Sequence, residues 1–219
     1  MRAVAFVVLL FSAVPALAQT RERIPLFAVD LQPGTIGLPQ AEGWVPEVPD
    51  DTELPGRAWG VSGGATVYPF RLGIFTFGFG ASISTARGKG ESLTITSGSG
   101  STATTRVTPI VRTGVTNLIP QVSINFGHKL GWSYLSAGVG TTKVSSSADA
   151  TTTTPQVIVP DSWNGTTNFG GGARWFMKPH LGASFDVRFV KLASRGATDT
   201  LPAAKRTQQW TISVGISIQ

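Results

Sequence analysis

The sequence contains no cysteine, few charged residues and no long apolar segment beyond its N-terminus. Without cysteine, the 219-residue chain can form neither a disulfide nor a thiol-dependent catalytic site. Charged residues make up only 14% of the chain. No apolar run after the N-terminus approaches the roughly 18 residues of a transmembrane helix. The sequence therefore predicts neither a helical membrane protein nor a disulfide-stabilised fold.

Histidine is also scarce, and this limits the chemistry open to the chain. The two histidines, His128 and His180, are both expected in short turns. Neither has nearby histidine, cysteine or carboxylate ligands that would support a metal site. His128 and Ser133 are close in sequence, but no acid is placed to orient the histidine for catalysis. We therefore predict no cofactor and no enzymatic activity.

The formal net charge is +6, which would favour a nucleic-acid partner only if the basic residues clustered. They are instead expected at the ends of segments, as charged residues in turns or at the level of lipid headgroups. No nucleic-acid partner is therefore predicted. The residues concerned are Arg57, Arg71, Arg87, Lys129, Lys178 and Lys191.

Residues 1–18 have the features of a secretory signal peptide. Arg2 supplies the positive charge, residues 3–14 form an apolar core, and Ala16-Leu17-Ala18 provides a small-x-small cleavage site. We expect residues 19–219 to be exported and to form a single domain.

The residue types that are plentiful favour β-structure. Threonine, serine, valine and aromatic residues are common, and many segments alternate between large apolar and small polar residues with period two. The clearest case is the segment in which Phe75, Phe77 and Phe79 alternate with threonine and glycine. Eight strands are predicted, within residues 24–35, 57–69, 75–84, 117–127, 132–143, 168–192 (two strands joined by a turn at Lys178-Pro179-His180) and 207–219.

The connections between these strands alternate in length. Long ones follow the first, third, fifth and seventh strands, and short ones follow the others. Residues 87–116 are compatible with a strand hairpin or with a mobile loop, whereas residues 144–166 are expected to form a polar loop. An even number of strands with short turns at one end and long loops at the other is typical of outer-membrane barrels. The sequence therefore predicts an all-β fold, an eight-stranded antiparallel up-and-down transmembrane β-barrel with short periplasmic turns and long extracellular loops.

Four charged residues are expected inside this barrel. Arg174, Asp186 and Arg188 lie on the inward-facing parity of their strands, and Asp30 lies on the first strand. An eight-stranded barrel has room inside only for side chains, and an enclosed charge without a partner costs several kcal/mol. We expect Asp186 to pair with Arg174 or Arg188, with Asp30 contributing, and interpret the cluster as structural filling rather than as an ion-selective constriction.

The opposite parity is expected to meet lipid. Tryptophans at or near strand ends are interpreted as an interfacial girdle; these are Trp59, Trp132, Trp175 and Trp210. The residues predicted to face lipid are Phe75, Phe77, Phe79, Phe185, Val187, Ile212, Val214 and Ile216.

The chain resembles the small outer-membrane β-barrel proteins, the porin-like or opacity-type group that includes the transmembrane domain of outer-membrane protein A. The resemblance lies in the glycine-rich stretch NFGGGARWF, the stretch HLGASFDVRF and a last strand that ends the chain. It implies a barrel in the outer membrane and specifies topology rather than activity. Members typically end in an aromatic residue, whereas this chain ends with Ile218-Gln219, and no peptidoglycan-binding domain is expected after the last strand.

Three functions are compatible with these features. The first is a non-enzymatic, monomeric outer-membrane barrel with a structural or surface-interaction role. Its partners would be outer-membrane lipid, the barrel-assembly machinery during biogenesis and a ligand at the extracellular loops. The second is a narrow porin-like channel for small solutes. The third is a soluble exported lipocalin-like barrel, which would turn Phe75, Phe77 and Phe79 inward to bind an apolar ligand.

Overall fold

The fold consists of antiparallel β-strands. The computed structural model describes residues 23–97, 103–152, 155–199 and 201–219, which contain ten strands. The predicted signal peptide lies outside the described residues. Within the described ranges, no helix is long and apolar enough to cross a membrane.

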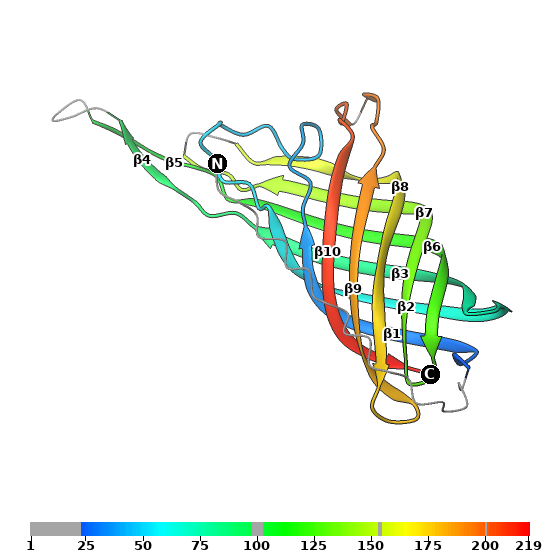
Figure 1. Ribbon diagram of the computed structural model, residues 1–219. Helices are drawn as coiled ribbons and strands as arrows, with labels where there is room; N and C mark the ends of the chain where they lie inside the picture. Colours follow the sequence, from blue (N-terminus) through cyan, green and yellow to red (C-terminus); the bar gives the residue numbers. More distant parts are fainter. Residues whose placement is uncertain (1–22, 98–102, 153–154, 200) are drawn as a thin grey trace, which may run out of the picture.

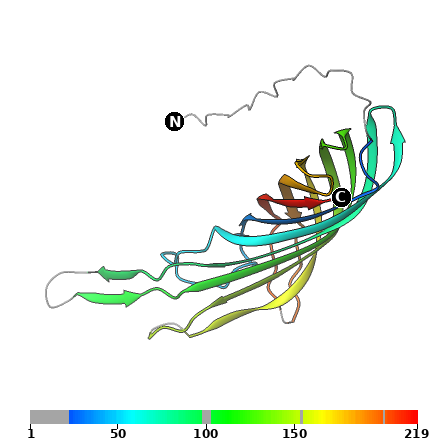
Figure 2. The same ribbon diagram turned by 90° about the horizontal axis from the view of Figure 1, so that it is seen from below.

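Eight of the strands form a closed barrel (Figures 1 and 2). Each strand pairs with its neighbours in the barrel, and every pairing is antiparallel. The first and last strands close the ring, with Leu31 opposite Ile216 and Val29 opposite Ile218. The barrel strands are β1 (Phe27–Gly37), β2 (Arg57–Leu72), β3 (Phe75–Lys89), β6 (Val111–His128), β7 (Gly131–Ala148), β8 (Val157–Phe176), β9 (Leu181–Leu192) and β10 (Thr207–Ile218).

The order of the strands around the ring follows their order in the sequence, which is an up-and-down topology. The predicted fold class and the predicted number of barrel strands are therefore confirmed. The connections β2–β3, β6–β7 and β8–β9 are only two to four residues long, and the other connections between consecutive barrel strands are longer. In the β2–β3 turn, Gly73 has a φ of +60°, a conformation that residues with a Cβ rarely adopt. We call the two rims of the barrel the short-turn end and the long-loop end.

The connection between β3 and β6 contains a separate hairpin. Strands β4 (Thr94–Ser97) and β5 (Thr104–Val107) pair only with each other and project beyond the long-loop end of the barrel (Figure 1). Of the two alternatives for residues 87–116, the structure therefore contains the strand hairpin.

The prediction of a polar loop over residues 144–166 was wrong. Strand β7 continues to Ala148 and β8 begins at Val157, so most of this segment is paired as strand. The alternation in this segment is hard to recognise because serine and threonine occur on both faces. On the inner face, apolar residues such as Val144 and Ala148 are buried.

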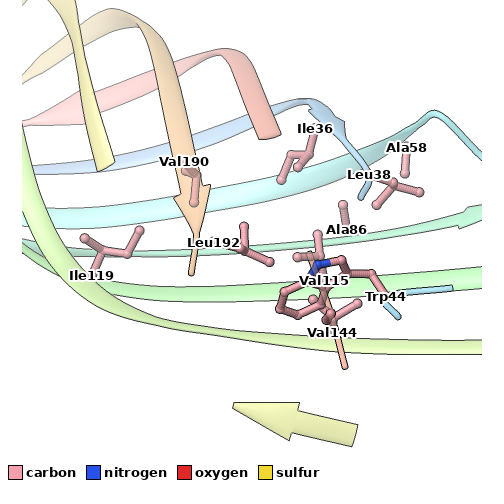
Figure 3. Close-up of a cluster of buried hydrophobic side chains, with 11 residues drawn as sticks. Ile36, Leu38, Trp44, Ala58, Ala86, Val115, Ile119, Val144, Val190 and Leu192 are labelled. Atoms are coloured by element: carbon pink, nitrogen blue, oxygen red, sulfur yellow. The ribbon is translucent and has the colours of Figure 1, made fainter. Parts of the chain in front are cut away.

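The long-loop end of the barrel is closed by an apolar cluster. Trp44, from the loop between β1 and β2, is almost fully buried inside the wall, beside Val115 and Val144 (Figure 3). Its indole Nε1 donates a hydrogen bond of 2.6 Å to the backbone carbonyl of Lys205, in the loop before β10. The guanidinium of Arg195 lies 5.2 Å from the centre of the Trp44 ring. One indole thus joins two long loops across the barrel mouth.

Trp44→Ala should release the loop between β1 and β2. Truncating a buried tryptophan costs about 3–5 kcal/mol, so the open form of the loop should become at least about a hundredfold more populated. Cleavage of the folded barrel by a glutamate-specific protease, at Glu42 or Glu47 in this loop, should accelerate accordingly. Trp163→Ala, which truncates a tryptophan that is 57% exposed, is the matched control. Equal cleavage rates for wild type and Trp44→Ala would contradict the role of Trp44 in holding the loop between β1 and β2 in place.

Candidate functional site

The barrel interior gathers the polar and charged side chains that the fold could use. Below the apolar cluster at the long-loop end lies a group of buried charges, and below that group lies an aromatic cluster at the short-turn end. We call the middle group the charged tier. It consists of Asp30 from β1, Gln121 from β6, Tyr134 from β7, Arg174 from β8, and Asp186 and Arg188 from β9.

The first ion pair of the charged tier joins β8 to β1, two strands that are not neighbours in the barrel. Arg174 holds Asp30 with two parallel hydrogen bonds, Nε to Oδ1 at 2.9 Å and Nη2 to Oδ2 at 2.5 Å. Both side chains are buried, with exposures of 3% and 10%. The guanidinium also lies 4.3 Å from the centre of the Tyr134 ring. A bidentate pair with this geometry ties the two strands together through the lumen.

The second ion pair lies within β9. Arg188 donates Nε to Asp186 Oδ1 at 2.6 Å and Nη2 to Oδ2 at 2.9 Å. The hydroxyl of Tyr134 donates to the same carboxylate, and Arg188 Nη1 donates to Gln121 Oε1. Asp186, which is only 2% exposed, therefore accepts from two side chains. These contacts link β6, β7 and β9.

The charged tier carries no net formal charge. The structure places Asp186 with Arg188, and Asp30 with Arg174, so that two carboxylates balance two guanidinium groups. This balance matters because a buried charge is tolerated only when it is paired and its remaining hydrogen-bonding groups are satisfied. The charged tier is therefore a structural cluster whose contacts hold several strands of the barrel together.

Glycines in the wall make room for these long side chains. A Cβ added at Gly172 would come within 2.7 Å of the Tyr134 hydroxyl, and one at Gly170 would come within 2.9 Å of Arg188 Cγ. Even closer would be two backbone carbonyls of β9, Phe185 O at 2.1 Å from the Cβ at Gly172 and Val187 O at 2.3 Å from the Cβ at Gly170. Glycines in this stretch of β8 therefore allow both the close approach of β9 and the packing of the charged tier.

An aromatic cluster fills the short-turn end and corrects one prediction. Trp132 was expected in the interfacial girdle, but it is 2% exposed and points into the barrel. Its ring stacks on Phe176 with centroids 5.0 Å apart and meets the edge of Tyr68 at 6.0 Å. Trp132 shares the parity of the inward residue Tyr134, so the alternation of β7, rather than its position at a strand end, decides its direction.

The other predicted girdle residues remain on or near the surface. Trp59 and Trp175 are 81% and 52% exposed, and Trp210 is half-buried. The residues predicted to face lipid also point outward, and their contact with lipid stays a prediction. Phe75, Phe79, Phe185, Ile212, Val214 and Ile216 are exposed, while Phe77 and Val187 are partly covered by neighbours on the same outer face.

The histidines take no part in the interior. His128 ends β6, and His180 lies in the β8–β9 turn, where its Nδ1 is 3.1 Å from the backbone carbonyl of Gln219. Among the described residues, no group of three or more histidine, cysteine or acidic side chains could hold a metal ion.

Three residues that hold the interior together were missed from the sequence. Tyr134 has the inward-facing parity of its strand, but its hydrogen bond to Asp186 was not foreseen. Gln121 likewise had the inward parity. A phenol and an amide among inward glycines and serines are a usable signal, because a long polar side chain in a narrow lumen must reach a partner. Trp44 lies in an aperiodic loop and gave no comparable signal.

Comparison with known proteins finds partial likenesses among solved structures. No protein-family model and no curated protein sequence matches the chain. The chain is similar to Neisserial surface protein A, with 11% identity and a TM-score of 0.47 over 89% of this chain and 97% of that one. The outer membrane protein OprG from Pseudomonas aeruginosa gives 11% identity and a TM-score of 0.46 over 90% and 97%. The outer membrane protease OmpT from Escherichia coli gives 7% identity and a TM-score of 0.46 over 75% of this chain, which spans only 64% of the protease.

The chain's own residues have the features of a membrane-spanning β-barrel. The ring of eight strands is closed, its outer face is broadly apolar, and its inner face is polar or filled. In hydrocarbon, a sheet must close on itself because unpaired backbone groups find no water there. This is the construction of a membrane-spanning barrel.

Asp186→Ala should destabilise the barrel strongly. The change leaves the Arg188 guanidinium buried without its carboxylate and removes the acceptor of the Tyr134 hydroxyl, which should cost about 3–5 kcal/mol. Urea unfolding of the barrel in lipid vesicles measures this loss. The control is Asp161→Ala, which breaks the exposed pair with Lys143 and should cost at most about 1 kcal/mol. An unchanged midpoint for Asp186→Ala would show that the charged tier does not stabilise the fold.

Proposed function

We propose that the protein is an integral outer-membrane barrel with a non-enzymatic role in the structure of the membrane or in contacts at the cell surface. The observation that carries this proposal is the combination of an apolar outer band with an interior filled along its length. Exposed apolar residues lie on the outer wall of all eight barrel strands. A band of this kind on a soluble protein would be an aggregation hazard.

The filled interior favours this role over that of a solute channel. Going from the short-turn end to the long-loop end, the lumen contains the aromatic cluster around Trp132, the charged tier, and the apolar cluster around Trp44. At each level, buried side chains from several strands contact one another. Eight-stranded barrels in general enclose only enough space for such side chains.

The direction of the aromatic residues argues against a lipocalin-like barrel. That alternative requires large apolar residues to line a cavity, whereas Phe75 and Phe79 are 42% and 47% exposed on the outer wall. The interior next to them contains Thr66, Tyr68 and Ser123 around Gly78 instead. This interior offers no apolar cavity lined by those phenylalanines.

The proposal includes the orientation and biogenesis of the barrel. The long-loop end, with the β4–β5 hairpin, faces the outside of the cell, and the short turns face the periplasm. Residues 1–18 direct export as a signal peptide, residues 19–219 form the mature barrel, and the barrel-assembly machinery inserts it as a monomer. A ligand would be contacted through the long loops, where the β4–β5 hairpin extends furthest from the barrel (Figure 1).

The barrel should conduct no ions in planar bilayers. We expect the charged tier and the two clusters to block the lumen, so wild-type protein should add no discrete current steps at applied voltages of either sign. Heat-modifiable gel migration of the same sample verifies that the inserted protein is folded. Reproducible single-channel steps from folded protein would contradict the filled interior and support the porin-like alternative.

A further inference from the structure

The outer wall of the barrel has a basic hollow near the long-loop end. It has a volume of about 540 Å³ and is formed by β3, β6, β7 and the start of β8. The alternation of the strands directs Arg87 and Lys89 of β3 and Arg112 of β6 outward, and all three are exposed. Their inward neighbours Thr113 and Ser146 are buried and lie 3.0 Å apart in a hydrogen bond. The hollow therefore opens on the outside of the wall.

Small residues in one row across the strands create the hollow. Arg87 is opposite Gly114, and Gly114 is opposite Ser145. A Cβ added at Gly114 would come within 2.8 Å of Ser145 Oγ and 3.7 Å of Arg87 Cγ. The floor thus consists of backbone and serine hydroxyls, while longer basic side chains stand along the β3 side.

Two cations of the hollow have no carboxylate to neutralise them. Arg112 pairs with Asp149 at 3.0 Å, and Asp161, an acidic residue that also lines the hollow, pairs with Lys143 at 2.6 Å. Arg87 and Lys89 form no ion pair with any acid in the described residues. The hollow therefore has a surplus of positive charge, together with serine hydroxyls that can donate hydrogen bonds.

The hollow begins where the apolar band ends. Along β3, the outward residues run from Phe75 to Ile83 and then change to Thr85, Arg87 and Lys89. Arg87 is four residues beyond Ile83, roughly 13 Å along the strand. Two exposed tryptophans lie near this level. Trp163 of β8 is opposite Lys143 of β7. Trp59 of β2 is next to Gly60, and Gly60 is opposite Ala86, the residue before Arg87. Tryptophan and basic residues together are typical of the boundary between hydrocarbon and headgroups.

We propose that this basic hollow binds the phosphate group of a lipid in the surrounding outer leaflet. The proposal rests on the membrane location argued above. A guanidinium and an ammonium beside serine hydroxyls are suited to a phosphate's oxygens. The hollow faces sideways, directly above the lipid-facing wall, so a lipid whose chains lie against Phe79 and Ile83 can place its headgroup in it. Soluble polyanions would instead approach along the barrel axis, towards the loops.

The test compares lipid binding by the wild type and by Arg87→Gln/Lys89→Gln. The folded barrel in phosphatidylcholine is titrated with phosphatidic acid, and native mass spectrometry counts the phosphatidic acid molecules retained. A cation near an anionic lipid surface contributes about fivefold to affinity, so the double variant should require about thirtyfold more phosphatidic acid for half-saturation. Heat-modifiable migration checks that both proteins are folded.

The matched control is Arg23→Gln/Lys178→Gln, which removes one arginine and one lysine, both exposed and both at the short-turn end. It should bind phosphatidic acid as the wild type does. Equal binding by the wild type and Arg87→Gln/Lys89→Gln, or an equal loss in the control, would overturn the lipid site. Full competition by millimolar inorganic phosphate would also overturn it, in favour of a free-anion site. If the protein does not enter the bilayer at all, the proposed membrane function fails together with the lipid site. If it enters the bilayer but does not retain phosphatidic acid through Arg87 and Lys89, only the lipid site fails.

Discussion

The structure depends on one constraint: a sheet that lies in hydrocarbon must pair every backbone N–H and C=O group within itself. The pairing of β1 with β10 satisfies it, because this contact removes the two edges that the sheet would otherwise expose. Closure also gives each strand an inner and an outer face with different surroundings. The period-two alternation of the sequence follows from that difference, since the outer face meets an apolar solvent and the inner face meets other side chains.

Closing a ring of only eight strands makes the interior narrow, and this determines how its polar residues are arranged. A charge in such a space needs a partner within reach, so the two arginines and two aspartates form bidentate pairs with no net charge. Glycines on β8 leave the volume that Tyr134 and Arg188 occupy. The same narrowness lets single aromatic residues finish the filling, with Trp132 at one end and Trp44 at the other. Outside, where the wall leaves the apolar band, residues such as Arg87 and Lys89 become free to carry charge.

The sequence predicted the fold well because alternation is a local property. The eight strands and the order of long and short connections could be read from segments such as the one containing Phe75 and Phe79. Alternation also indicated which charges face inward, but not their partners, because the contact between Arg174 and Asp30 joins residues 144 positions apart across the lumen. Trp132 was misplaced because its position at a strand end was given more weight than its parity. Strand ends within residues 144–166 were missed because serine and threonine give no contrast between faces, and Trp44 lies in a loop without any period.

The central claim is that the apolar face of the barrel meets lipid while its interior is filled. The absence of native cysteine allows this to be measured with single nitroxide labels, at Phe79→Cys, Val214→Cys and Ile216→Cys on the outer face. Thr105→Cys, in the exposed β5 strand, serves as the aqueous reference. In lipid vesicles, the three outer-face labels should collide frequently with oxygen and rarely with a water-soluble nickel complex, and the reference should behave in the opposite way. Outer-face labels that meet the nickel complex freely, or that are shielded from both reagents, would contradict the account.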